Sequence, residues 1–277
     1  MRLQTVAAGQ GVVWVREGFR TFFKRPLAFA ALFAAFMFAV FALALLPFVG
    51  ALVVLALLPL VSLGFMIATR TAVAGGLPTA RVFVEPLRGA GPRRTAMLQL
   101  GLIYAAATFV VMWLSDIADR GAFEALMEAM PAAQTTPDEV ASRFGAPGLL
   151  VGLMLRFGLA ALLSVPFWHA PALVHWDGHG CAKALFSSTL ACWRNRGAFA
   201  VYGLAWFALI IVFGMVGSLV FALLGQPQLF ALAAVPLSLV FTTVFYVSLY
   251  LTFADCFVAS DAAAATDPAD HPPRRLS

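Results

Sequence analysis

The sequence has few charged residues: Asp, Glu, Lys and Arg make up 11% of the chain, against about 25% in soluble domains. No charged side chain occurs in residues 26–69 or in residues 197–254. A water-soluble globule of 277 residues would need a polar surface that this composition does not supply. With 62% hydrophobic residues and a mean hydropathy of +0.92, the chain is predicted to be a membrane protein.

Each of the two charge-free runs is long enough to cross a bilayer twice. In a helix with a rise of about 1.5 Å per residue, runs of 44 and 58 residues measure about twice the ~30 Å hydrocarbon thickness or more. Their continuous apolar character also excludes a β-barrel, whose strands alternate between apolar and polar residues. Each run therefore predicts a helical hairpin.

The predicted fold class is all-α: a polytopic transmembrane helical bundle of six helices, arranged as three hairpins. Residues 1–258 are expected to form a single integral membrane domain, and the Ala-, Asp- and Pro-rich residues 259–277 a disordered cytoplasmic tail. A hydrophilic loop is expected at 116–147, with a short helix near its start. The expected spans are about 27–46, 49–69, 96–115, 148–170, 198–224 and 229–253.

The distribution of basic residues predicts the orientation. With the N-terminus inside, 15 of the 18 Lys and Arg residues fall on the cytoplasmic side, as the positive-inside rule requires. We therefore expect a bacterial inner (cytoplasmic) membrane protein with N- and C-termini in the cytoplasm and residues 116–147 in the periplasm. Since that places the three cysteines at or near the reducing side, no disulfide is expected among Cys181, Cys192 and Cys256.

A short amphipathic interfacial segment and a basic cluster precede each hairpin. In the first, Val12, Val15, Phe19 and Phe22 recur at helical spacing. Such a segment lies in the headgroup plane, with its cations facing anionic lipid. The alternative interpretation is that the cations only fix the topology. The predicted lipid headgroup contacts are Arg16, Arg20, Lys24, Arg25, Arg81, Arg88, Arg93, Arg94, Lys183, Arg194 and Arg196.

Arg156 is the one charge that interrupts a predicted span. If the fourth span begins at Gly148, Arg156 lies about 12 Å into a ~30 Å core, where a charged residue is by default a substrate or partner contact. The alternative is that this helix shifts along the membrane normal and Arg156 snorkels to the periplasmic headgroups. Arg156 is the candidate substrate-binding residue.

Residues 169–181 contain side chains that can bind metals: His169, His175, Asp177, His179 and Cys181. Their alternating spacing matches no familiar zinc motif, so no metal and no cofactor is predicted. Asp177 and Asp255 are expected to be solvated at cytoplasmic helix ends. Gly148-x-x-x-Gly152 and Gly214-x-x-x-Ser218 are small-residue patterns typical of helix packing.

Several short stretches of the sequence match those of a known family. They are residues 22–26, 64–70, 167–173, 183–186 and 191–195, together with Ser248-x-Tyr250 and Asp255-x-Phe257. On these stretches the chain resembles a family of proteobacterial inner-membrane proteins whose function has not been assigned. The resemblance covers most of residues 10–258 but not 116–147 or the tail. It implies a six-helix membrane fold and no enzyme class.

Catalytic and phosphate-binding fingerprints such as a P-loop, G-x-S-x-G or H-E-x-x-H do not occur in the sequence. We therefore predict a non-enzymatic multi-pass protein that serves envelope organisation or membrane-partner assembly. Its partners would be membrane lipids and other membrane proteins or a second copy, with no nucleic acid. The alternatives are a transporter or permease-like protein for a small anion or lipid using Arg156, and hydrolysis or group transfer using residues 169–181.

Overall fold

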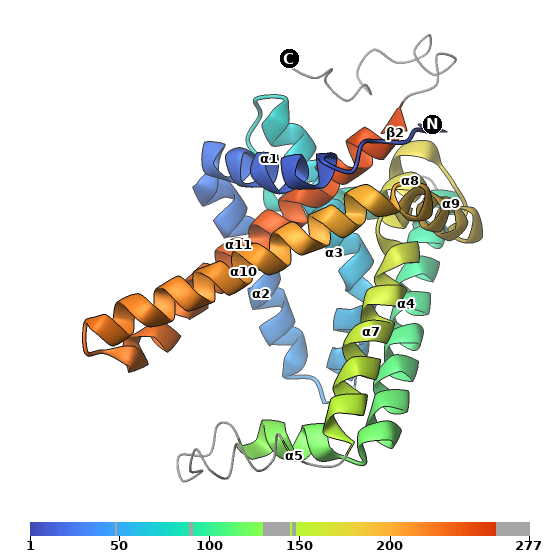
Figure 1. The fold of residues 1–277 in the computed structure, drawn as a ribbon. Coiled ribbons are helices and arrows are strands. Elements are labelled where there is room, and N and C mark those ends of the chain that lie inside the picture. The colour runs from blue at the N-terminus through green and yellow to red at the C-terminus, as the bar shows by residue number, and fades with distance from the viewer. Residues whose placement is uncertain (48, 89–90, 130–144, 146–147, 259–277) are drawn as a thin grey trace.

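The structure, a computed structural model, describes residues 1–47, 49–88, 91–129, 145 and 148–258 (Figure 1). The predicted tail and most of the predicted hydrophilic loop lie outside the described residues. The α-helices are α1 (Gln10–Lys24), α2 (Pro26–Ala44), α3 (Val49–Val73), α4 (Gly91–Asp119), α5 (Ala122–Ala129), α7 (Leu149–Phe167), α8 (Ala170–Asp177), α9 (Cys181–Arg194), α10 (Arg196–Leu223) and α11 (Pro227–Cys256).

Six segments are long and apolar enough to cross a membrane, and they confirm the all-α fold class. They are α2, α3, α4, the α7–α8 pair, α10 and α11. A two-residue antiparallel pair of strands, β1 (Arg2–Leu3) and β2 (Phe257–Val258), joins the two ends of the described chain. Both described ends therefore lie at the same end of the molecule, beside α8 and α9 (Figure 1).

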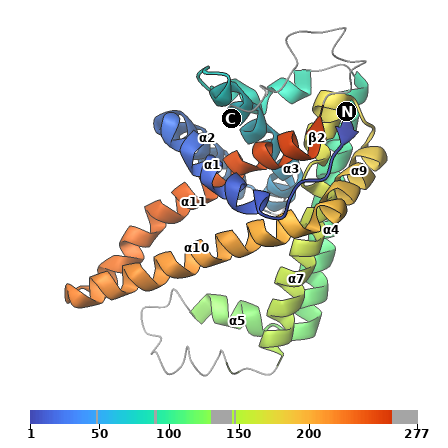
Figure 2. The ribbon, with the colours of Figure 1, turned by 45° about the horizontal axis from the view of Figure 1, so that its top comes forward.

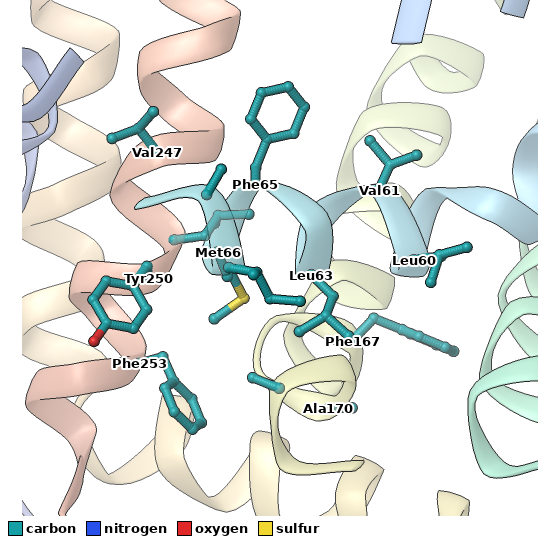
Figure 3. Close-up of a cluster of buried hydrophobic side chains, with 14 of the residues drawn as sticks. Leu60, Val61, Leu63, Phe65, Met66, Phe167, Ala170, Val247, Tyr250 and Phe253 are labelled. Atoms are coloured by element: carbon teal, nitrogen blue, oxygen red, sulfur yellow. The ribbon is translucent and has the colours of Figure 1, made fainter. Parts of the chain in front are cut away.

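The core forms around α3, half of whose apolar window is buried. This helix packs against α2, α4, α8 and α11, and its side chains Leu63, Phe65 and Met66 are fully buried (Figure 3). Phe65 stacks on Tyr246 of α11 with 5.0 Å between ring centroids. Because α3 is covered by other helices, it holds the hairpins together at the end where both described chain ends lie.

The amphipathic segment predicted before the first hairpin is helix α1. Its apolar stripe packs on α10 and α11 rather than facing lipid: Trp14, Val15 and Phe22 are buried, while Val12 stays about half exposed. Arg16 and Arg20 lie on the exposed side. Figure 2 shows α1 lying across the base of the α10–α11 hairpin.

The segments before the other two hairpins differ from each other. The segment before α4 forms two short 3₁₀ turns, η1 (Ala80–Phe83) and η2 (Glu85–Arg88), because Pro86 lacks the N–H that a longer helix needs. The segment before α10 is the regular helix α9, with Ala184, Ser188 and Ala191 buried.

Several predicted boundaries differ from the structure: α3 continues to Val73 instead of 69, and α4 begins at Gly91 instead of 96. Helix α4 continues to Asp119, four residues beyond the expected end at 115, and α5 confirms the short helix that follows. The fourth span is divided into α7 and α8 near Pro166 and Pro171. Pro171 lies in the first turn of α8, where its missing N–H costs nothing.

Candidate functional site

Arg156, the candidate substrate-binding residue, forms ion pairs with two carboxylates of α4. Its guanidinium contacts Asp116 and also lies 3.3 Å from Oδ2 of Asp119. The Asp119 side chain is 1% exposed and that of Arg156 is 14% exposed, whereas that of Asp116 is 62% exposed. The ring of Phe123 covers the guanidinium at 3.9 Å. The Arg156–Asp119 pair is therefore largely shielded from solvent.

Two glycines of α7 make room for this ion pair. A Cβ atom on Gly152 would lie 2.3 Å from Cβ of Asp119, so any other residue would push the carboxylate away. Gly148, the residue before α7, has φ of +87°, a conformation that favours glycine. A Cβ atom there would lie 3.1 Å from the carbonyl oxygen of Ala118. The first small-residue pattern is thus confirmed as a packing contact between α4 and α7.

Asp119 is the last residue of α4, and its buried carboxylate lies against α7. The guanidinium of Arg156 offsets the cost of burying this carboxylate. The substrate role of Arg156 remains a prediction. Any anionic substrate would have to compete with Asp119 and Asp116 for the guanidinium.

At the junction between α7 and α8, the hydroxyl group of Ser188 bridges two backbone groups that would bond to each other in a continuous helix. The backbone N–H of His169 donates to Oγ of Ser188 at 3.0 Å, and the same hydroxyl donates to the carbonyl of Val165 at 3.0 Å. In an unbroken helix the His169 N–H would bond to the Val165 carbonyl directly. Ser188 of α9 therefore stabilises the bend between α7 and α8.

Buried His169 contacts Thr252 rather than the other metal-capable side chains of residues 169–181. Its Nε2 lies 3.2 Å from Oγ1 of Thr252. Among the described residues, no group of three His, Cys, Asp or Glu side chains is arranged to hold a metal ion. Burial raises the pKa of the Cys181 thiol and raises that of Cys192 to about 12, so both thiols are poor nucleophiles at neutral pH.

The sequence predicts that the carboxylates of Asp177 and Asp255 are solvated. In the structure both bind the N-terminal segment instead. Oδ2 of Asp255 accepts hydrogen bonds from Nε2 of Gln10 at 2.6 Å and from Nε1 of Trp14 at 2.8 Å. Asp177 pairs with the amino group of Met1 at 2.8 Å and with His179 at 3.0 Å. The roles of Gln10 and Trp14 cannot be recognised from the sequence, because their partner Asp255 is more than 240 positions away.

All eleven predicted headgroup contacts have exposed side chains, so their position fits the prediction without testing it. Arg93 also borders a hollow of about 510 Å³ with Arg70, Glu85 and His175, beside Trp176 of α8. The guanidinium of Arg70 lies 5.6 Å from the Trp176 ring. This hollow is polar and lies at the end of the molecule where both described chain ends lie.

Comparison with known proteins supports the membrane assignment. The chain is 34% identical over 269 residues to the probable inner membrane protein BTH_II0599 of Burkholderia thailandensis, covering 97% of this chain and 98% of that protein. No family model and no solved structure matches. The similarity extends over nearly the full length of both chains, so the six apolar helices are those of an inner membrane protein. The chain therefore belongs to the same family as this probable inner membrane protein.

Proposed function

We propose that this inner membrane protein is a non-enzymatic scaffold that serves envelope organisation by assembling with another membrane-spanning chain. The observation that carries the proposal is the form of the α10–α11 hairpin. It projects away from the other helices and is joined to them only at its base (Figures 1 and 2). A projecting pair of helices offers two apolar faces to a partner within the bilayer.

The burial pattern defines the projecting part. In α10 the buried residues are Ala198, Tyr202 and Trp206, all in the first half of the helix. From residue 207 to residue 242 no described side chain is buried, although Phe213 packs on Phe241 and Phe221 on Phe230 within the hairpin. Phe241, near the base, also packs on Phe19 of α1, whereas the Phe221–Phe230 contact joins only the two helices of the hairpin.

The projecting hairpin also carries small residues that allow close approach. A Cβ atom on Gly214 would meet nothing within 4 Å, so the backbone is open to a neighbouring helix there. Helix association in lipid depends on such close packing, since apolar contact alone gains little against lipid tails. The pairing of Arg156 with two carboxylates further favours a scaffold over transport, because the guanidinium already has internal partners.

Site-directed photo-cross-linking tests the assembly role. Met215 in the projecting hairpin and Met154 in α7 are each 67% exposed, so they form a matched pair. With benzoylphenylalanine at each position in cells, we expect a protein adduct at 215 and lipid adducts alone at 154. The adduct mass separates a second copy from a different chain. Equal protein labelling at both positions, or specific solute flux by the purified protein in liposomes, would contradict the proposal.

We also propose that both termini lie in the cytoplasm, since most basic residues lie toward the end of the molecule that holds both described chain ends. Helices α5 and α1 lie at opposite ends of the molecule (Figure 1), and Glu128 of α5 and Arg20 of α1 are both exposed. We expect a membrane-impermeant maleimide to label Glu128→Cys in cells with a permeabilised outer membrane, and Arg20→Cys only after lysis. The reverse pattern would place the termini in the periplasm.

A further inference from the structure

An open groove lies where the α10–α11 hairpin diverges from α7. It has a volume of about 710 Å³ and is lined from α7, α9, α10 and α11. Half of the residues that line it are aromatic: Trp168, Trp193, Phe199, Tyr202, Trp206, Phe241 and Phe245. Its only charged residue, among the described residues that line it, is Arg196. We propose that this groove binds one phospholipid with an anionic headgroup, its phosphate at Arg196 and an acyl chain along the aromatic wall.

The aromatic wall is held in place before any lipid enters. The indole N–H of Trp168 donates to Oγ1 of Thr252 at 3.1 Å, which fixes the ring between α7 and α11. Trp168 packs edge-on against Phe245 at 5.8 Å, and Trp206 packs on the same ring at 5.9 Å. A preformed wall lowers the ordering cost of binding an acyl chain.

The charge lies at one end of the groove, as a phospholipid requires. Arg196 begins α10, so the positive end of the helix dipole adds to its own charge. Its guanidinium lies 5.6 Å from the ring of Trp193, which is 67% exposed at the foot of α9. Trp and Arg together at the end of a span are typical of the headgroup level of a membrane. Exposed Arg194 adds a second cation nearby.

The length of the groove fits one leaflet. Its lining extends along α10 from Arg196 to Ile210, which is about 21 Å of helix. One leaflet is about 20–22 Å thick, half of the ~40–45 Å bilayer with its headgroups, so one phospholipid with its phosphate at Arg196 extends along the groove. The site rests on the membrane location of the chain and not on the proposed assembly role, so either can fail alone.

Native mass spectrometry of the purified full-length protein tests the site. The probes are phosphatidylglycerol and phosphatidylcholine with identical acyl chains. We expect one bound lipid, with phosphatidylglycerol preferred. Arg196→Gln should weaken phosphatidylglycerol binding about fivefold, the effect of one cation near a headgroup, and weaken phosphatidylcholine binding less, because the choline cation offsets the charge of its phosphate. Arg120→Gln removes an exposed cation between α4 and α5, away from the groove, and should change neither.

A second pair of variants tests the groove itself. Gly203 lines it and Gly214 does not, and a Cβ atom at either position of α10 would meet nothing within 4 Å. Gly203→Leu should reduce binding of both lipids at least tenfold, and Gly214→Leu should not. Thr242→Phe fills the groove from α11 and should repeat the loss. Unchanged lipid binding in the groove variants, equal effects of the two arginine changes, or a change in oligomer mass instead of lipid binding would overturn the proposal.

Discussion

Replacing Arg156 by methionine is expected to lower the free energy of unfolding by about 3–5 kcal/mol. Methionine keeps an unbranched side chain but leaves Asp119, which is 1% exposed, without its cation in an apolar helix interface. Removal of one partner of a buried ion pair lowers the free energy of unfolding by more than the intact pair contributes to it. The remaining charge is still buried, and no opposite charge compensates for its loss of hydration. Unfolding of the purified full chain in mixed micelles measures the effect.

The controls for this prediction use the two carboxylates. Asp116→Asn removes a partner that is 62% exposed and should cost less than about 1 kcal/mol. The double variant Arg156→Met, Asp119→Leu removes both buried charges and should recover most of the loss. Losses that simply add in the double variant would show that the two residues are not coupled. A stable Arg156→Met protein that has lost a measured solute flux would favour the transporter alternative.

The hairpins could be predicted from sequence because their cause is local. A run such as residues 197–254 has no charged side chain, so lipid is its favourable environment wherever the rest of the chain lies. The turn within that run follows from Gly225, which has φ of +68°, and from the following proline. The amphipathic α1 was predicted in the same way, from the 3.6-residue spacing of its apolar side chains.

The polar contacts could not be predicted, because each depends on a partner distant in sequence. Asp119 looks like the start of a hydrophilic loop until Arg156, 37 positions later, is placed beside it. Trp14 and Asp255 lie 241 positions apart, and nothing near either residue indicates the other. Hydropathy likewise showed that α1 has an apolar face but not whether lipid or α10 covers it.

Gly11→Ala is expected to detach α1 from the base of the α10–α11 hairpin. A Cβ atom at position 11 would lie 2.3 Å from the carbonyl oxygen of Ala198 and 2.5 Å from the backbone nitrogen of Tyr202. Both are backbone atoms of α10 and cannot rotate away, so the helices must separate. Overpacking of this kind costs about 1–3 kcal/mol. Separation would also weaken the hydrogen bonds that Gln10 and Trp14 donate to Asp255.

Trypsin cleavage at Arg16 and Arg20 reports this detachment directly, because a protease needs the helix to open even though both side chains are exposed. If the equilibrium between docked and detached α1 shifts by about 2 kcal/mol toward the detached form, cleavage should be about 30-fold faster. This holds when α1 opens and closes faster than trypsin cleaves it. Gly9→Ala is the matched control, since a Cβ atom at position 9 would meet nothing within 4 Å. If both variants were cleaved at the wild-type rate, α1 would not approach α10 at Gly11, and its apolar stripe would lie in lipid, as the sequence alone predicts.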